Sequence, residues 1–357
     1  MTAGKWALVG GTALIGPEQR PMIDAVVVAE DGKITSVGPQ GEAVLPHDAE
    51  VIDATGMTVL PGFIDAHVHI GFYPPSSVLA GGVTCARDLG WPPEEIFPLA
   101  AESQRPTFEG PTILPAGAML TAPGGYPTRA SWAPAGTGLV VEGRSGANTA
   151  VERMVGGGAT VIKVALNPPA GPTLDAATLA EIVRAAHAHG LKVTGHVHGL
   201  EELTKALDAG VDELAHMLMG LESIDAATIE RMVDQDMAVL PTLAIRFGRE
   251  LDVAVENLRN FRRAGGRVIY GTDLGNAGTT PGIDKNEVAL MAAAGMTPAD
   301  IIHSATASSA RWLQLSSTGI LEPGRDADVI AVRGDPLGEL AALGDVAIVI
   351  RRERRAR

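Results

Sequence analysis

The chain carries histidines, a lysine and an aspartate where apolar, strand-like runs end or are interrupted. His67 and His69 follow the apolar run that begins after Pro61-Gly62. Side chains two residues apart on a strand point to the same face, so these two imidazoles can bind one metal ion. Four further candidates stand in or at the end of later strand-like runs: Lys163, His196, His216 and Asp273. We expect all six side chains to form a metal centre at one end of a barrel.

Two other His-x-His pairs occur, and geometry separates them. His187 and His189 fall at the end of an expected helix, where residues two apart point about 200° away from each other. They are assigned to a solvated helix terminus. His198 shares a strand face with His196 and has two interpretations: it polarises a substrate carbonyl, or it is a structural histidine.

Lys163 is unusual because it interrupts the apolar run Thr160–Val164. A protonated amine would repel a metal ion, and its unpaired burial is unfavourable. Either an acidic neighbour pairs with Lys163, or the neutral amine adds carbon dioxide to give a carbamate whose two oxygens bridge two metal ions. Asp273, on the last strand expected in the barrel, is predicted to act as both metal ligand and general base.

The part of the chain that must position these residues alternates between two kinds of element, strands and helices. Between residues 58 and 316, β-like runs alternate with helical patterns such as 175–189, which is typical of a parallel sheet with crossover helices. We predict an α/β fold, a (β/α)8 TIM barrel, in which active sites lie at the carboxyl ends of the strands. Residues 1–57 and 317–357 read as short strands and are expected to form one small β-sandwich domain from both termini. Residues 121–148 lack a period, and either a lid or a plain excursion fits them.

Composition limits the partners. The formal charge of −14 disfavours nucleic acid and anionic membrane surfaces, which attract positive patches, and favours a small-molecule substrate. No run is long and apolar enough to span a membrane, and the apolar run near the N-terminus is too short for a signal peptide. Cys85 is the only cysteine. We expect a cytoplasmic protein, and a homo-oligomer is compatible with the composition.

Taken together, the motifs resemble the amidohydrolase superfamily, above all its prolidase-like and imidazolonepropionase-like members. The resemblance covers nearly the whole chain and rests on these segments: Pro61–His69, Ala80–Thr84, Arg87–Gly90, Ile162-Lys163, Gly195-His196, Ala215-His216, Gly271–Leu274, Ala305-Thr306 and Gly319–Gly324.

The resemblance implies a two-metal site, with zinc as the first choice and other divalent metals as alternatives. It implies that the buried ion is held by His67, His69 and Asp273, the exposed ion by His196 and His216, and that carbamylated Lys163 and a hydroxide bridge the pair. Such a hydroxide would hydrolyse an amide, lactam, lactone or ester bond of a small molecule or dipeptide-like substrate. Two alternatives are a one-metal deaminase or imidazolone-type cyclic amide hydrolase, and a non-catalytic barrel scaffold.

This chain departs from its relatives where substrate would bind. It has Gly124-Gly125-Tyr126 where such proteins often have Gly-Gly-His, so Tyr126 is a candidate substrate contact. Arg246 either grips a substrate carboxylate or is solvated. The substrate itself does not follow from the motifs.

Overall fold

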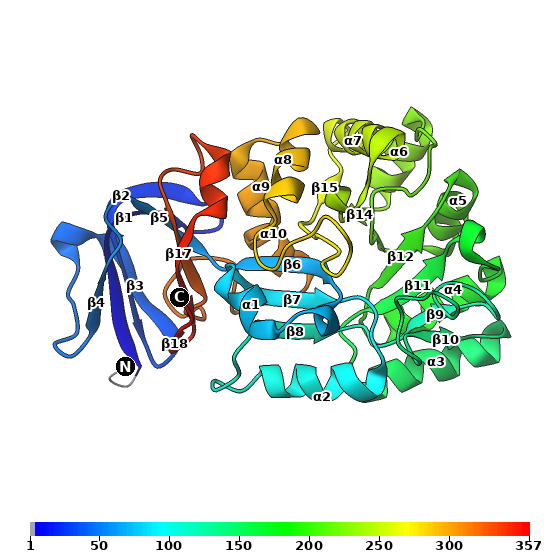
Figure 1. The fold of residues 1–357 in the computed structure, drawn as a ribbon, viewed down its shortest axis with the longest axis horizontal. Helices are drawn as coiled ribbons and strands as arrows, with labels where there is room; N and C mark the ends of the chain where they lie inside the picture. The colour runs from blue at the N-terminus through cyan, green and yellow to red at the C-terminus, as the bar shows by residue number, and fades with distance from the viewer. Residues whose placement is uncertain (1–3) are drawn as a thin grey trace.

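The computed structural model describes residues 4–357. Figure 1 shows two parts, a β-rich part that contains both chain ends and a larger part in which strands and helices alternate. Across residues 4–357, no helix combines the length and the apolar character that crossing a membrane requires.

The β-rich part is a mixed eight-stranded sheet, ordered β18-β17-β16-β5-β1-β2-β3, with β4 paired to β1. Its strands are β1 (Lys5–Ile15), β2 (Arg20–Glu30), β3 (Lys33–Pro39), β4 (Glu50–Asp53), β5 (Met57–Pro61), β16 (Val329–Arg333), β17 (Val346–Arg351) and β18 (Arg354–Arg355). Strand β5 joins the two chain ends because it pairs parallel with β1 and antiparallel with β16. A small β domain from both termini is therefore confirmed. The boundaries expected at 57/58 and 316/317 stay predictions, and β5 belongs to this terminal sheet.

The larger part is a barrel of parallel strands. These are β6 (Phe63–Val68), β7 (Val83–Asp88), β8 (Thr112–Pro115), β9 (Met119–Thr121), β10 (Gly138–Val140), β11 (Ile162–Leu166), β12 (Val193–Val197), β13 (Glu213–Leu214), β14 (Ala238–Val239) and β15 (Arg267–Val268). Two backbone hydrogen bonds join the two parallel sheets into a closed barrel. One runs from Thr160 N, before β11, to Pro115 O of β8 (2.8 Å), and the other from Ala66 N of β6 to Tyr270 O, after β15 (3.0 Å). The predicted (β/α)8 barrel is confirmed.

Helices cover the outside of the barrel (Figure 1). They are α1 (Pro75–Ala80), α2 (Pro93–Ser103), α3 (Gly143–Gly157), α4 (Ala176–Ala188), α5 (Leu200–Ala209), α6 (Ala226–Asp234), α7 (Gly248–Arg263), α8 (Lys285–Ala293), α9 (Pro298–Ser304) and α10 (Ala307–Trp312). The helix expected at 175–189 is α4. It begins where the Asp175 side chain accepts a hydrogen bond from Thr178 N and ends at His189, before Gly190.

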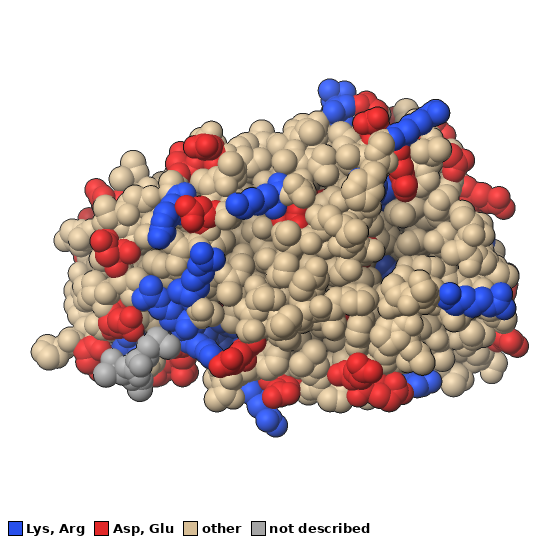
Figure 2. Space-filling view, in the orientation of Figure 1, with Lys and Arg blue, Asp and Glu red and all other residues tan. Residues whose placement is uncertain are grey.

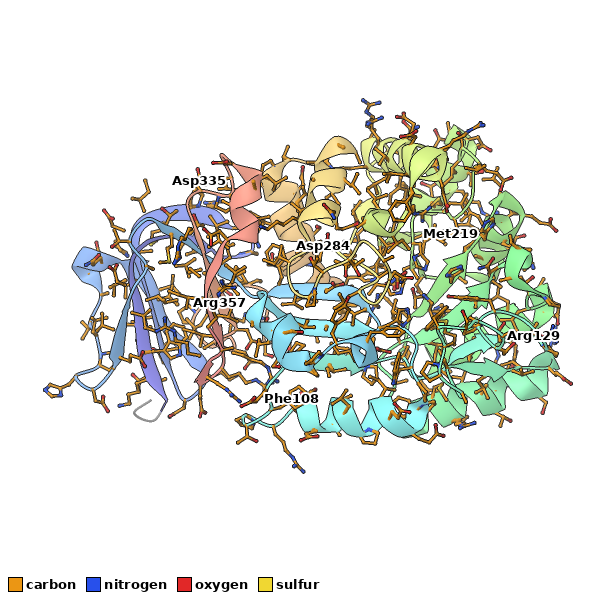
Figure 3. The ribbon with its side chains drawn as sticks, viewed as in Figure 1. Phe108, Arg129, Met219, Asp284, Asp335 and Arg357 are labelled. Carbon is orange, nitrogen blue, oxygen red and sulfur yellow. The ribbon has the colours of Figure 1, made fainter. Side chains whose placement is uncertain are left out.

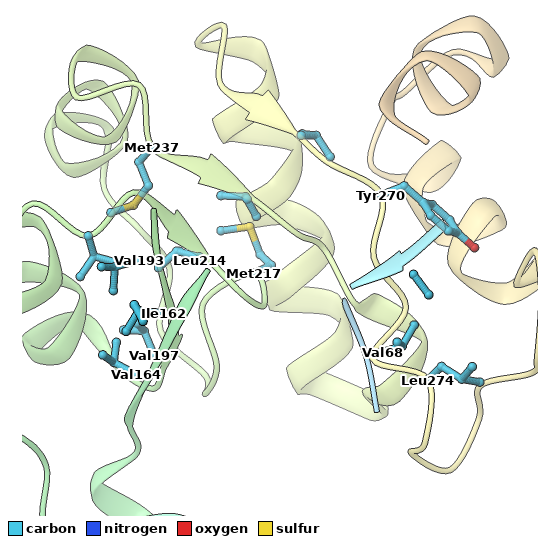
Figure 4. Packing of buried hydrophobic residues seen from close by; sticks show 14 of the residues in the cluster. Val68, Ile162, Val164, Val193, Val197, Leu214, Met217, Met237, Tyr270 and Leu274 are labelled. Atoms are coloured by element: carbon cyan, nitrogen blue, oxygen red, sulfur yellow. The ribbon is translucent and has the colours of Figure 1, made fainter. Parts of the chain in front are cut away.

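The strands between the helices are buried along their whole length, as β6, β7, β11 and β12 show. Figure 4 shows how Ile162, Val164, Val193 and Val197 of β11 and β12 project into the apolar core. Because both faces of a parallel strand are covered, a polar residue inside such a strand must find a partner or a function.

Candidate metal centre

One cavity of about 370 Å³ at the carboxyl ends of the barrel strands is lined by all six side chains expected to bind metal. They are His67, His69, Lys163, His196, His216 and Asp273. They come from β6, β11, β12 and the segments that follow β6, β13 and β15. Residues far apart in the sequence meet here because the parallel strands all end on the same side of the barrel.

His67, His69 and Asp273 bring their polar atoms together. The Nε2 atoms of His67 and His69 each lie 3.2 Å from Oδ1 of Asp273. One possible ligand atom from each of the three buried residues lies within 4.8 Å of the other two, a grouping that could hold a metal ion.

Hydrogen bonds to the backbone fix which ring nitrogens face Asp273. Nδ1 of His67 lies 2.7 Å from the carbonyl oxygen of Ala215, and Nδ1 of His69 lies 3.0 Å from that of Gly90. A carbonyl oxygen only accepts, so Nδ1 carries a proton in both rings and Nε2 faces the carboxylate. Burial lowers the pKa of His67 well below the usual histidine value. The neutral ring of His67 therefore points a lone pair at an anionic oxygen, an arrangement that a cation between them would stabilise.

His196 and His216 form another side of the cavity, with ring centroids 4.7 Å apart. Nδ1 of His216 makes a 2.9 Å hydrogen bond with Oγ1 of Thr242, and Asn167 donates Nδ2 to Nε2 of His196 over 3.1 Å. Burial lowers the pKa of His196 to about 3 and lowers that of His216 well below its usual value. Both imidazoles are thus neutral at pH 7, the form that binds metal ions.

Asp65 ties the end of β6 to the segment that carries Asp273. Its Oδ1 accepts hydrogen bonds from the backbone N of His67 and of Thr272, each 3.1 Å, and its Oδ2 accepts from Oγ1 of Thr272 over 2.6 Å. Asp273 has a φ of +58° in the left-handed region, which is unfavourable for a residue with a side chain by roughly 1–2 kcal/mol. The Asp65 network holds the backbone in this conformation and so aims the Asp273 carboxylate into the cavity.

Lys163 reaches the cavity from deeper in the barrel. Strand register pairs Lys163 with Thr194, whereas His196 pairs with Ala165 two residues further along β11. Two residues of strand span roughly 6.6 Å, a depth that the long lysine side chain can bridge. A shorter side chain at this position would stop below the imidazoles.

The Lys163 amine is buried and has no hydrogen-bond partner among residues 4–357. Burial lowers the pKa of Lys163 to about 7, although Asp273 and Glu213 oppose the shift. Glu213 instead accepts hydrogen bonds from Arg87 and from Nε1 of Trp312, each at 2.5 Å. A substantial fraction of Lys163 is therefore neutral near pH 7, the form that can react with carbon dioxide.

Tyr126 and His198 were both expected to contact substrate. Tyr126 lines the cavity, and its ring centroid lies 4.9 Å from that of His196. His198 is not among the lining residues; its ring lies beside Gly220, where an added Cβ would come within 3.1 Å of Cε1. His196 lies within β12 and reaches the cavity wall. His198 follows the last residue of β12 and does not line the cavity, although the two residues are two apart in the sequence.

Arg246 is buried and is not among the residues that line the cavity. It is 3% exposed and donates to the carbonyl oxygens of Leu218 (3.0 Å) and Met217, with Glu250 3.5 Å away. The alternative of a solvated Arg246 is therefore wrong. Two backbone carbonyls and a carboxylate lie against the two terminal nitrogens of the guanidinium, while its Nε is buried without a hydrogen-bond partner among the described residues. These contacts help to hold the chain that follows His216.

Sequence reasoning missed several lining residues, among them Phe72, Trp132 and Asn167. The ring of Trp132 lies 5.1 Å from His69 and 6.1 Å from Tyr126, measured between centroids. The segment 121–148 that carries Trp132 consists largely of turns, with β10 and the start of α3. A tryptophan in a segment without apolar periodicity has no core to join, and that signal could have identified it.

Comparisons with known proteins agree with this geometry. The model of the amidohydrolase family matches residues 58–352. The chain is 28% identical to an enamidase from Eubacterium barkeri over 94% of this chain and 89% of the relative. It is 27% identical to an imidazolonepropionase from Halobacterium salinarum over 92% of this chain and 90% of the relative. A putative prolidase from Bifidobacterium longum superposes with a TM-score of 0.85 at 25% identity, covering 99% of this chain and 94% of the other.

The family match spans most of the chain and includes every side chain around the cavity. The relatives match over nearly their whole length, so the likeness includes the terminal β domain as well as the barrel. This chain belongs to the amidohydrolase family and is a hydrolase that acts on carbon–nitrogen bonds.

Proposed function

We propose that this amidohydrolase uses two divalent metal ions, with zinc as the first choice, to hydrolyse an amide or lactam bond of a small molecule or dipeptide-like substrate. Lactones and esters fit the same chemistry. Relatives named enamidase, imidazolonepropionase and putative prolidase support this range of bonds. The convergence of six polar side chains on one cavity is the observation that carries the proposal. A non-catalytic scaffold is disfavoured because that set is complete.

The polar atoms fit divalent cations. His67 Nε2, Lys163 Nζ and Asp273 Oδ1 are buried and have no hydrogen-bond partner among the described residues. Buried polar atoms without partners are rare because their desolvation is unfavourable. Imidazole nitrogen and carboxylate oxygen are ligands that zinc accepts. The donor set therefore supports bound metal better than it supports an empty polar cavity.

The residues divide into two groups. In the proposal, His67, His69 and Asp273 hold one ion, and His196 and His216 hold the other. The neutral amine of Lys163 attacks carbon dioxide, forms an N–C bond and releases one proton, which leaves a carbamate anion. Lys163 in this form would be a further anionic ligand, and its negative charge would offset part of the charge of the ions.

When bound, the ions polarise a substrate carbonyl and lower the pKa of a coordinated water from about 15.7 to about 7, which supplies the nucleophile. Asp273 would accept a proton from the attacking water and deliver it to the leaving nitrogen. Its orientation by the Asp65 network suits this transfer. Tyr126 is proposed to contact the substrate from the cavity wall. Substrate contacts by His198 and Arg246 remain predictions, because both side chains would have to move first.

A one-metal deaminase or imidazolone-type hydrolase is the second candidate. It is favoured by one observation: within residues 4–357, the histidine, cysteine and carboxylate atoms close enough to hold an ion belong to His67, His69 and Asp273 alone. In that case Lys163 would not be a metal ligand, and bicarbonate would not affect metal binding.

Metal counting separates the two candidates. The purified protein is freed of metal with a chelator, reloaded with zinc with or without bicarbonate, and measured by elemental analysis. We expect two ions per chain with bicarbonate and fewer without it. One ion per chain, independent of bicarbonate, would favour the second candidate.

The Lys163→Ala variant tests the carbamate directly. It should lose tight binding of the metal pair and the hydrolytic activity, and short carboxylic acids should restore part of both. Lys192→Ala is the matched control, because Lys192 precedes β12 at the amino end of that strand, lies over the ring of Trp312 and does not line the cavity. Unchanged metal content and rate in Lys163→Ala would contradict the carbamate.

The remaining proposals concern the binding partner, the cellular location and the oligomeric state. Figure 2 shows acidic and basic side chains mixed over the displayed face, and the formal charge is −14. This supports a small-molecule substrate over nucleic acid or an anionic membrane surface as the partner. The cytoplasmic location and the homo-oligomer stay predictions from composition.

A further inference from the structure

Part of the cavity wall is apolar and aromatic. It consists of Phe72, Met119, Tyr126, Trp132, Met219 and Ile245, and the uncharged amides Asn167 and Asn276 line the same cavity. The ring centroid of Trp132 lies 6.2 Å from that of Phe72 and 6.1 Å from that of Tyr126. Phe72 is 40% exposed although it is a large apolar side chain. A ligand ring or alkyl group placed here would remove several aromatic faces from water at once.

The same cavity offers a substrate carboxylate no free cation. Among the described residues that line it, Lys163 is the only lysine or arginine, and it lies on the floor among the proposed metal ligands. Arg246, the nearest expected grip, is buried and donates to the carbonyl oxygens of Met217 and Leu218. Arg129 and Arg144, the two arginines of segment 121–148, are exposed and do not line the cavity, and Arg129 lies apart from Met219 in Figure 3.

A carboxylate next to the scissile bond would therefore be desolvated against aromatic and thioether side chains without a cation to pair with, which is unfavourable. A carboxylate that turned to the metal ions instead would take the place that the scissile carbonyl needs. An uncharged apolar group has neither problem. Both the shape of the wall and its lack of charge thus favour the same kind of substrate.

We propose that the substrate is an uncharged amide or lactam with an aryl or alkyl group beside the scissile bond, held against Trp132, and that the enzyme discriminates against a carboxylate at that position. The proposal rests on the proposed hydrolytic function. It differs from a dipeptidase specificity, which needs a group to bind the terminal carboxylate.

A matched pair of substrates tests the selectivity. N-(phenylacetyl)benzylamine and N-(phenylacetyl)phenylglycine differ only by a carboxylate on the carbon beside the amide nitrogen. With the zinc-loaded enzyme, kcat/KM should be at least about tenfold higher for the neutral amide, since one unpaired charge readily accounts for that factor. Equal values, or a preference for the acid, would overturn the proposal.

A charge placed in the wall gives a second test. Met219 is part of the cavity wall and only partly buried, so an arginine there can reach the bound substrate. Met219→Arg should shift the kcat/KM ratio towards the acid by at least about tenfold, whereas the control Met219→Leu should leave the ratio unchanged. An unchanged ratio in Met219→Arg would count against the proposal.

A binding measurement separates this inference from the hydrolytic function. The sulfonamide analogues of the two substrates cannot be cleaved by the same attack, and calorimetry with the zinc-loaded protein gives their Kd. The neutral sulfonamide should bind at least about tenfold more tightly than the acid, and Trp132→Ala should weaken its binding by about three- to tenfold. Tighter binding of the acid, or no binding of either, would refute the proposed specificity. Selective binding without any cleavage of the amides would instead refute the hydrolytic function and leave the specificity standing.

Discussion

Asp273 has two proposed roles, metal ligand and proton acceptor, and both depend on the negative charge of its carboxylate. Burial raises the pKa of this carboxyl, but the neighbouring imidazoles and Lys163 lower it further than burial raises it, so the net shift is downward. The side chain is therefore anionic across the whole neutral range, ready to bind a cation and to accept a proton. Its backbone is held at a positive φ by the hydrogen bonds of Asp65 and Thr272, which fix the direction of the carboxylate.

Asp273→Asn tests the proton-transfer role. The amide keeps the shape of the side chain but cannot take a proton, so kcat at saturating zinc should fall by about 10²- to 10⁴-fold while the unfolding midpoint stays close to that of the parent. Asp175→Asn, at the N-cap of α4, changes the same chemical group away from the cavity and should leave kcat unchanged. A nearly native kcat in Asp273→Asn would remove Asp273 from proton transfer.

The proposed metal ligands could be predicted residue by residue because each is a polar side chain in a buried strand or within a few buried residues after one. Strand geometry then fixes its direction, as for His67. Phe72, Trp132 and Asn167 could not be predicted this way, because they lie outside regular strands and their directions depend on how loops fold over the barrel. The inward turn of Arg246 onto two carbonyls was likewise not readable from sequence.

Among the elements, α8 supports the loop after β14. The Oε2 atom of Glu287 accepts a hydrogen bond from Ala244 N (2.8 Å) in the short helix Leu243–Ile245, which follows Thr242 and ends at a lining residue. Glu287 is fully buried, and burial raises its pKa to about 8 from the usual 4.5. Helix α8 thus holds one wall of the cavity through a carboxyl group that is protonated at neutral pH.

This pKa shift predicts a pH dependence of stability. Between about pH 4.5 and about pH 8 the unfolded chain has released the Glu287 proton that the folded chain keeps, so the free energy of unfolding falls as the pH rises. Urea unfolding near pH 5 and near pH 8 should show that the parent loses at least about 1.4 kcal/mol more than Glu287→Gln, the value of one pKa unit. Glu256→Gln on the exposed surface of α7 is the control. Equal pH dependence in the parent and Glu287→Gln would contradict a neutral Glu287.

The alternation of strands and helices was predictable because both faces of each barrel strand are buried and each helix has its own apolar period, as α4 shows with Leu179, Ile182, Val183 and Ala186. Segment 121–148 was harder. Strand β10 within it has three residues and pairs only with β9, so no periodic signal marks it. Its structure depends on contacts with the barrel rather than on local sequence.

At the scale of the whole molecule, a buried ion pair joins opposite sides of the barrel below the metal site. Arg87 of β7 and Glu213 of β13 are almost fully buried, and Trp312 of α10 donates to the same carboxylate. Arg87 also donates to the carbonyl oxygen of Ala66 over 2.9 Å. Three elements distant in sequence therefore share one carboxylate.

Glu213→Ala should leave the Arg87 charge buried without a partner and lower the free energy of unfolding by about 3–5 kcal/mol. Asp208→Ala, which removes the exposed pair with Arg231, should change it by only about 0–1 kcal/mol. Denaturant unfolding of both variants measures the difference. A loss of less than about 1 kcal/mol in Glu213→Ala would show that the pair does not fasten the barrel.

The joining of both chain ends in one sheet was also predictable, since each end reads as short strands on either side of the barrel segment. The pairing of β5 between β1 and β16 was not, because strand order is set by long-range contacts. In Figure 1 this sheet lies at the other end of the molecule from β11 and β12, the strands that carry Lys163 and His196.

The most direct test of the account is anomalous diffraction from crystals grown with zinc and bicarbonate. The account predicts two zinc peaks among His67, His69, His196, His216 and Asp273, and additional density on Nζ of Lys163 that joins the two ions. A single peak or none, together with an unmodified Lys163 amine, would contradict it.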